Sequence, residues 1–214
     1  MPDPLVLGFD TSAAHCAAVL LRGDRVLAER HEEMGKGQAE RLMPMLDDVL
    51  AEGGADWAAL DRIGVGIGPG NFTGIRLSVS AARGLALALK IPAVGVSVLD
   101  ALALGAKGPL VACLDARRGK VFLQVHGRGD KAPVMADLDD LPDGLGGLPC
   151  VGSGAEAVAA RIGGTVQAAR FTPASAIARI AAIRSLDGLE RPAPLYLRQA
   201  DAAPPRDAPP AILP

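Results

Sequence analysis

The chain has no excess of charge of either sign and very few aromatic residues. Its 22 Lys and Arg side chains are balanced by 24 Asp and Glu, which leaves a formal net charge of -2. A protein that binds nucleic acid through bulk charge needs a clear excess of basic residues, so this class is disfavoured. Phe, Tyr and Trp make up only 3% of the 214 residues, too few for the platforms on which single-stranded nucleic acids stack.

Cysteine and histidine are also scarce and scattered. No CxxC pair and no metal-ligand spacing occurs among Cys16, Cys113, Cys150, His15, His31 and His126. This argues against a disulfide framework and against a bound metal. The start of the chain lacks the basic and apolar segments of a secretory signal, and no run approaches the ~20 apolar residues that cross a bilayer. We therefore expect a cytoplasmic protein with no membrane partner.

What the chain does contain is a regular alternation of apolar runs and turns. Half of it is hydrophobic and 21% is charged, a balance typical of globular proteins. Short apolar runs that end in polar or glycine turns predict strands, and apolar residues at i, i+3 and i+4 predict helices. In the first half these rules predict strands at 5–9, 16–21, 25–29, 63–67 and 92–96 and helices at 38–52, 73–90 and 98–106. Thr73 is the predicted N-cap of the second helix.

The second half begins like the first. After a glycine-containing join at 105–109, the apolar run 110–114 is followed by Asp115, as the run 5–9 is followed by Asp10. A turn and a strand at 120–126 come next. The weaker patterns beyond them predict a strand at 149–152 and helices at 155–161 and 173–185.

This repetition predicts a diverged internal duplication. Two halves that each open with strand, aspartate, turn and strand are typical of the α/β architecture of actin, sugar kinases and Hsp70. We therefore predict an actin-like fold of two βββαβα-type subdomains, the second one diverged. The predicted division is 1–106, 107–200 and a Pro-rich tail at 201–214 without regular structure.

The glycine-rich segment GPGNFTGIR at 68–76 is the first candidate binding motif. It lacks the lysine of a phosphate-binding P-loop and the third glycine of a dinucleotide fingerprint. A helix N-terminus with free amides remains, which is a generic anion site. A tight turn that brings the helix close to the sheet explains the same residues.

A second candidate site lies at the aspartates that follow the two matching strands. Asp10, Thr11, Ser12 and Asp115 stand where the phosphate-binding hairpins of an actin-like fold lie, and an aspartate there would hold magnesium through water. Capping of an ordinary hairpin is the competing interpretation, and Asp10 is the stronger nucleotide or anion candidate. No resident cofactor is expected, and only weak nucleotide binding stays open.

The helices at 38–52 and 73–90 carry more apolar and small residues than packing on a sheet requires. About half of these positions must face the sheet, and the excess predicts a helix-bundle interface with a partner. Met45 is predicted to lie beyond the main apolar stripe. The candidate interface residues are Leu42, Met45, Leu46, Val49, Gly74, Ile75, Ser78 and Ala82.

Five segments together resemble one known family. They are LVLGFDTSAAHCAAVLL at 5–21, GQAERLMPMLDDVL at 37–50, IGVGIGPGNFTGIRLSVSAARGLALALKIPAVGVSVLDALA at 63–103, ACLDARRGKVFLQV at 112–125 and APLYLRQAD at 193–201. The chain is similar over residues 5–201 to the bacterial TsaB family of tRNA threonylcarbamoyladenosine biosynthesis proteins. The motif G-P-G-x-F-T-G-[IL]-R is highly specific to that family.

The resemblance implies an actin-like ASKHA fold and a partner subunit that is not an enzyme. TsaB-type proteins are non-catalytic paralogues of TsaD, which places a threonylcarbamoyl group on the adenosine after the anticodon (position 37) of ANN-decoding tRNAs. TsaD binds its metal through a His-x-x-x-His pair, whereas the matching positions here are Val98 and Leu102. Neither side chain is a metal ligand.

The resemblance also implies the partners. TsaB-type proteins dimerise with TsaD through the helices that correspond to 38–52 and 73–90, form homodimers through the same helices, and are joined by the ATPase TsaE on the heterodimer. The tRNA is then held mainly by the complex. The alternative function from the residues alone is an ASKHA-type ATP-dependent phosphotransferase or ATPase that uses Asp10 and Asp115.

Overall fold

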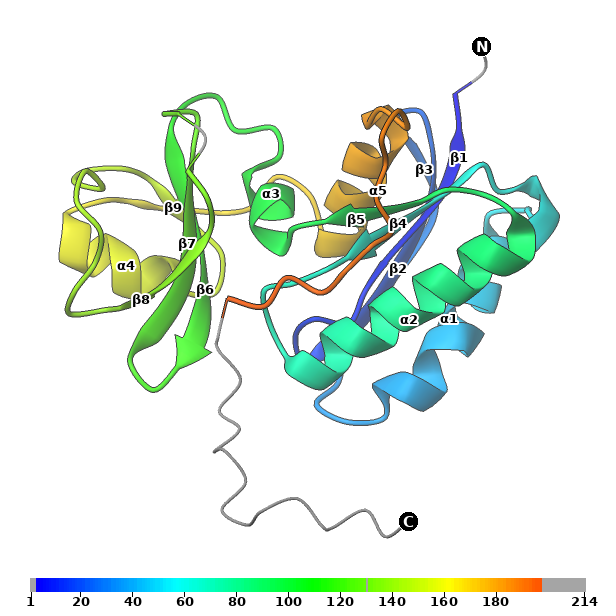
Figure 1. Ribbon diagram of the computed structural model, residues 1–214, viewed down its shortest axis with the longest axis horizontal. Coiled ribbons are helices and arrows are strands. Elements are labelled where there is room, and N and C mark those ends of the chain that lie inside the picture. The colour runs from blue at the N-terminus through cyan, green and yellow to red at the C-terminus, as the bar shows by residue number, and fades with distance from the viewer. Residues whose placement is uncertain (1–2, 130, 198–214) are drawn as a thin grey trace, which may run out of the picture.

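The computed structural model describes residues 3–129 and 131–197, which form two lobes that each contain a five-stranded mixed sheet (Figure 1). In the first sheet the strand order is β3-β2-β1-β4-β5. Its strands are β1 (Leu5–Asp10), β2 (His15–Arg22), β3 (Arg25–Glu33), β4 (Arg62–Gly66) and β5 (Ala93–Val96). Strand β1 pairs antiparallel with β2 and parallel with β4.

The second sheet repeats this order as β8-β7-β6-β9-β10. Its strands are β6 (Leu110–Arg117), β7 (Lys120–His126), β8 (Val134–Asp137), β9 (Cys150–Val151) and β10 (Val166–Gln167). Strand β6 takes the place of β1, because it pairs antiparallel with β7 and parallel with β9. The predicted duplication and the actin-like fold class are confirmed.

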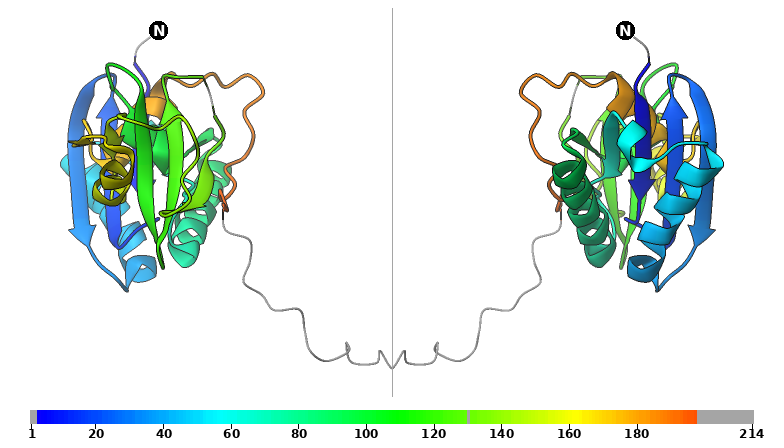
Figure 2. Two further views of the ribbon diagram at one scale, coloured as in Figure 1. Left: turned by 90° about the vertical axis from the view of Figure 1, so that its left-hand side faces the viewer. Right: turned by 90° about the vertical axis from the view of Figure 1, so that its right-hand side faces the viewer.

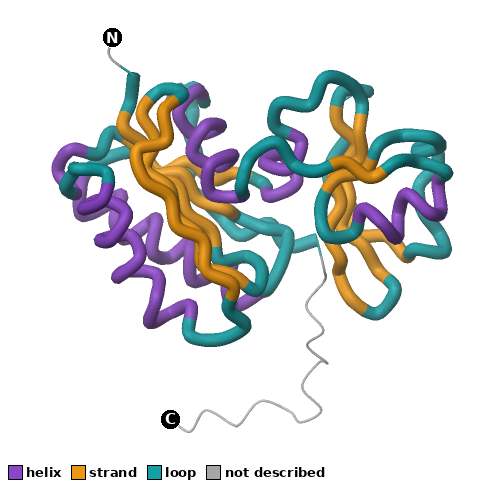
Figure 3. The backbone as a smooth tube through the Cα atoms, turned by 180° about the vertical axis from the view of Figure 1, so that it is seen from behind, coloured by secondary structure: helices purple, strands orange, loops and turns teal. Residues whose placement is uncertain are grey.

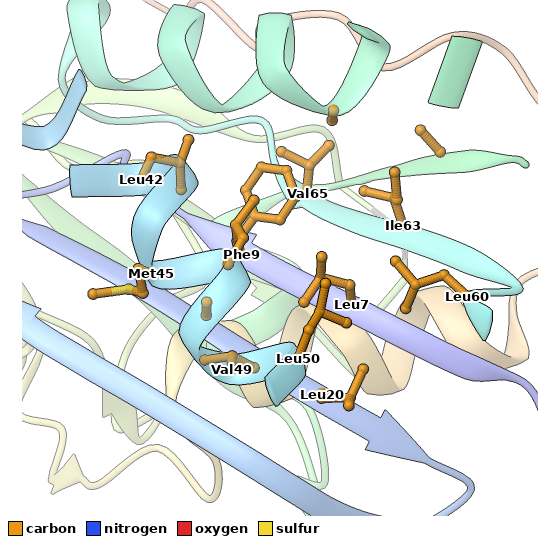
Figure 4. Close-up of a cluster of buried hydrophobic side chains, with 14 of the residues drawn as sticks. Leu7, Phe9, Leu20, Leu42, Met45, Val49, Leu50, Leu60, Ile63 and Val65 are labelled. Atoms are coloured by element: carbon orange, nitrogen blue, oxygen red, sulfur yellow. The ribbon is translucent and has the colours of Figure 1, made fainter. Parts of the chain in front are cut away.

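Helices cover both faces of the first sheet (Figure 3). On one face, α1 (Gln38–Glu52) packs over β2 and β3, and α2 (Phe72–Leu89) packs over β4 and β5. On the other face lies α5 (Pro173–Ile183), which contacts β1, β2 and β4. Successive side chains of β1 point to opposite faces of the sheet, so β1 contributes to the core on both faces. Leu7 and Phe9 face α1 (Figure 4), whereas Val6 faces α5.

The second lobe is smaller. Helix α4 (Ala155–Ile162) packs against β6 and β9 on one face of the second sheet (Figure 2). Helix α3 (Val98–Ala103) packs against the other face of β6 and also contacts α5, so it lies between the lobes. A short 3-10 helix, η1 (Trp57–Ala59), precedes β4 and is capped by Asp56, whose carboxylate accepts a hydrogen bond from the Ala59 amide at 2.9 Å.

Several boundaries differ from the prediction. Helix α2 begins at Phe72, and its N-cap is Asn71, because the Asn71 carboxamide accepts hydrogen bonds from the amides of Thr73 and Gly74. Helix α3 ends at Ala103 instead of 106. The predicted second domain, 107–200, is wrong at its C-terminal end, because α5 packs on the first sheet and completes that lobe.

Strands β8 and β10 were not predicted, and the predicted tail at 201–214 lies outside the described residues. In the part of the chain that the structure describes, α2 is the one helix with the length and apolar composition of a membrane span. Five of its residues are buried in the lobe, namely Gly74, Ile75, Ser78, Val79 and Ala82. Helices in the core of a globular protein can have the same length and apolar composition as a membrane span.

Candidate functional site

The C-terminal end of β1 carries a buried cluster of polar side chains. Asp10 is 0% exposed, and its Oδ2 accepts hydrogen bonds from Ser12 Oγ and from His15 Nε2, both at 2.8 Å. Its other oxygen, Oδ1, has no hydrogen-bond partner among the described residues. Oδ1 lies against the Cα of Gly66, where a Cβ atom would overlap it. The end of β4 must therefore be a glycine for Asp10 to be buried there.

His15 is the charge partner of Asp10. Burial opposes the charged imidazolium, but the hydrogen bond and the charge of Asp10, together with the charge of Glu33, outweigh it and raise the pKa of His15 above its ordinary value. The ring of His31, which itself pairs with Glu33, lies 4.9 Å from the His15 ring. The sequence pattern gives His15 no role, so this pair was not predicted.

The cluster holds the residue types of a serine hydrolase triad without its geometry. In such a triad histidine lies between serine and aspartate, whereas here Ser12 and His15 both bond the same oxygen of Asp10. Cys16, the neighbour of His15, faces the core, and burial raises its pKa to about 11. The arrangement supplies no activated nucleophile.

The sequence-predicted nucleotide residues are brought together only in part. Thr11 is 0% exposed and donates its hydroxyl to the Gly74 carbonyl at 2.7 Å, and Ser12 is 2% exposed. Asp115 stands at the equivalent place in the second lobe but is exposed, and its Oδ1 accepts from the Arg117 amide at 2.8 Å. Asp115 therefore performs the hairpin-capping role that was the alternative to magnesium binding.

The start of α2 is also occupied by groups of the chain itself. Asn71 caps the free amides of Thr73 and Gly74, and the Asn71 amide donates to the Ser12 carbonyl at 2.6 Å. A Cβ at Gly74 would overlap the Thr11 carbonyl oxygen. Among the described residues no group of three or more His, Cys, Asp or Glu is placed to hold a metal ion. The glycine-rich segment thus performs the close-packing role that competed with an anion site.

All eight residues predicted as a partner surface lie in the chain's own core. Gly74 is buried, and the side chains of Leu42, Met45, Leu46, Val49, Ile75, Ser78 and Ala82 are at most 1% exposed. Met45 does not lie beyond the stripe, because Leu42, Met45 and Val49 are related by i, i+3 and i+7 and share one face. These eight residues fix the helices on the sheet, and the opposite face of each helix is the exposed one.

The outer face of α2 exposes mainly apolar and small residues, whereas the outer face of α1 also carries charged residues. Only five of the eighteen residues of α2 are buried. Leu87 is 80% exposed, and Met43 of α1 is 41% exposed. At Gly84 a Cβ atom would meet nothing within 4 Å. A surface of this kind commonly marks an interface.

A cluster that sequence reasoning missed holds the last described segment against α2. The guanidinium of Arg76 lies 3.7 Å from the centre of the Phe72 ring, and Arg76 Nε donates to the Tyr196 hydroxyl at 2.8 Å. The spacing of Phe72 and Arg76 by four residues signals a helical pair, but nothing local signals Tyr196. The segment also contacts the loop that follows β4, because the Leu195 amide donates to the Ile67 carbonyl at 2.8 Å.

Comparison with solved structures defines the class. The fold matches YeaZ from Pseudomonas aeruginosa with a TM-score of 0.74 and 28% identity, over 90% of this chain and 99% of that one. The ethanolamine utilization protein EutJ from Carboxydothermus hydrogenoformans, at a TM-score of 0.52 and 14% identity, shares the fold alone. The chain is thus an α/β protein of the actin-like ASKHA class.

Sequence comparison defines the family. The family model TsaD, tRNA N6-adenosine threonylcarbamoyltransferase, matches residues 28–173. The TsaB protein of Buchnera aphidicola is 32% identical over 65% of this chain and 71% of its own length. TsaB of Escherichia coli is 32% identical over 58% of this chain, and the match spans 56% of its length. The chain belongs to the TsaB family of tRNA threonylcarbamoyladenosine biosynthesis proteins.

Proposed function

We propose that this chain is a non-catalytic cytoplasmic subunit that dimerises with TsaD and supports threonylcarbamoyl transfer to the adenosine after the anticodon of ANN-decoding tRNAs. Family membership supports the pathway. The observation that carries the scaffold role is the exposed apolar face of α2, centred on Gly84 and Leu87.

Two features of the chain support a role without catalysis. The positions that match the metal-binding histidines of TsaD are Val98, which is 7% exposed, and the half-buried Leu102 of α3. Neither offers a lone pair to a metal. In the polar cluster, His15 and Ser12 both bond to Oδ2 of Asp10, and Oδ1 is buried against Gly66, so the carboxylate is closed off from solvent. The scaffold would act by linkage, because binding favours the active conformation of TsaD.

The interface is tested with Gly84→Glu/Leu87→Glu. Both positions are exposed, and glutamate favours a helix more than glycine does, so the variant should unfold at the wild-type temperature or slightly above it. Two charges buried in an apolar helix bundle should weaken binding to TsaD by about 100-fold or more. Ala160→Glu on the exposed side of α4 is the matched control and should bind TsaD normally.

The readouts are co-purification with TsaD and reconstitution of tRNA modification with and without this chain. A TsaD-bound Gly84→Glu/Leu87→Glu variant would overturn the assigned interface. Full modification in the absence of the chain would overturn the function. Gel filtration of the same samples measures whether TsaE joins the complex and whether the chain alone forms a homodimer through the same face.

The alternative, an ATP-dependent phosphotransferase, is motivated by the equivalent places of Asp10 and Asp115 at the ends of β1 and β6. It requires magnesium-dependent ATP binding that Asp10→Asn abolishes. Calorimetry on the isolated chain decides it. We expect no tight binding, because Asp10 is buried against His15.

A further inference from the structure

Two crossovers join the lobes, and a hollow of about 440 Å3 is lined by these crossovers, by α3 and by the neighbouring residues of the second lobe. The first crossover, 104–109, leads from α3 to β6, and the second, 168–172, leads from β10 to α5 (Figure 1). The hollow is lined from both crossovers and contains none of the residues of the Asp10 cluster. Its volume falls within the roughly 300–1,000 Å3 of small-molecule sites.

The floor of the hollow is apolar and belongs to the packed core. Leu110 of β6 and Val151 of β9 are 4% and 2% exposed, and Leu102 of α3 packs against them. These three side chains come from elements that contact one another, so the floor is a fixed part of the fold. It would favour the hydrocarbon portion of a ligand.

The rim carries positive charge from both crossovers. Lys107 lies on the first crossover and Arg170 on the second, and the lining includes no Asp or Glu. Neither cation forms an ion pair within the described ranges. The Arg170 side chain reaches the first crossover at Gly105, where a Cβ atom would lie 2.7 Å from Arg170 Cδ. The two crossovers are therefore in contact at the rim.

We propose that this hollow binds an organic monoanion with a short apolar body, of the class of medium-chain carboxylates. The carboxylate would pair with Lys107 and Arg170, and the hydrocarbon chain would lie on the floor formed by Leu102, Leu110 and Val151. Because the two cations come from different crossovers, the bound anion ties the crossovers together. Binding to the folded state alone then raises the unfolding temperature.

The test uses octanoate as the probe. Octylammonium has the same apolar chain with the opposite charge, and inorganic phosphate has negative charge without an apolar chain, so these two compounds are the controls. We expect saturable one-to-one binding of octanoate by calorimetry and a higher unfolding temperature. The double variant Lys107→Gln/Arg170→Gln should bind octanoate about tenfold or more weakly. Both residues are exposed, so the variant should fold normally, which its unfolding temperature without ligand verifies.

The matched control is Arg25→Gln/Lys36→Gln, which removes the same charge from exposed positions outside the hollow and should bind octanoate normally. Equal binding of octanoate and octylammonium, equal binding by the double variant, or no saturable binding at millimolar octanoate would each overturn the proposal. Strong binding of phosphate alone would replace it with a simple anion site. Co-purification with TsaD is a separate readout, so these outcomes leave the proposed function untouched.

Discussion

A carboxylate with no exposure to water is stable as an ion only where a cation or several donors lie beside it. Asp10 is 0% exposed, and His15 and Ser12 both bond to one of its two oxygens. The pair joins the end of β1 to the start of β2. It also lies under the start of α1, because Gln38 Nε2 donates to the His15 carbonyl at 2.6 Å and to the Ala13 carbonyl at 2.7 Å.

The raised pKa of His15 predicts a pH-dependent stability. An imidazolium that is favoured in the folded state contributes stability that is complete below its unfolded pKa, about 6.5, and is lost as the pH rises through the folded pKa. The advantage of the wild type over His15→Gln in urea unfolding should therefore shrink as the pH rises above 6.5. The charged groups that face His15 are Asp10 and Glu33, with the His31 ring alongside.

Titration of the His15 ring by NMR checks the same prediction directly. A His15 that titrates at or below 6.5, or an advantage over His15→Gln that grows with pH, would contradict it. His31→Gln serves as the comparison for an exposed histidine, because the ion pair of His31 is with the exposed Glu33 and only its ring lies beside His15. Its effect on stability should be small at every pH.

Among the elements, α2 is capped at its N-terminus by Asn71, whereas the sequence pattern predicts Thr73 as the cap. Asn71→Ala removes the acceptor for the amides of Thr73 and Gly74 and should lower the free energy of unfolding by about 1 kcal/mol. Asn71→Asp keeps the acceptor and should be nearly neutral. Thr73→Ala is the matched control, since Thr73 lies inside the helix, and its effect should stay within about 0.5 kcal/mol. Denaturant unfolding that ranks Thr73→Ala as the costlier change would restore Thr73 as the cap.

The elements that could be predicted are those whose own residues define them. The helical stripe and the terminal Gly53 give α1 its bounds of Gln38–Glu52, and the mostly apolar run after Gly119 gives β7. Strands β8 and β10 carry no such pattern, because β8 has four residues and β10 has two, and pairing with a neighbouring strand is what creates them.

The candidate site could also be predicted only where its own local sequence defines it. The strand that ends at Asp10 is visible in the sequence, but its partner His15 lies five residues away and is indistinguishable locally from a packing histidine. From the sequence alone the apolar stripes of α1 and α2 predict a partner surface, yet stripes of that kind mark the core-facing side first. The outer face, with Gly84 and Leu87, becomes visible only when the helices are placed on the sheet.

At the scale of the whole molecule, the first lobe is completed by a helix that comes last in the chain. Helix α5 closes the face of the first sheet that α1 and α2 leave open, and Ala174, Ile177 and Ala178 are at most 1% exposed there. The fit is close, since a Cβ at Gly8 of β1 would lie 2.7 Å from the Ala178 Cβ. The second lobe is therefore an insertion between α3 and α5.

This connectivity predicts that residues 1–106 do not fold alone, although the sequence marks them as a domain. Without α5 the apolar side chains of β1, β2 and β5 that pack on it, among them Val6, Val19 and Val94, are exposed to water. Burial of such a layer is worth more than the whole stability of a small domain. A second chain in which 168–197 follows 106 through a short Gly-Ser linker restores α5, and the contact of Arg170 with Gly105 shows that the two ends lie close together. We expect dispersed amide NMR signals and cooperative urea unfolding from the joined chain only.

Replacement of Ile177 and Ala178 by aspartate in the joined chain is the matched control and should abolish both. Cooperative unfolding of 1–106 alone would show that α5 is an accessory to the first lobe and not a part of its core.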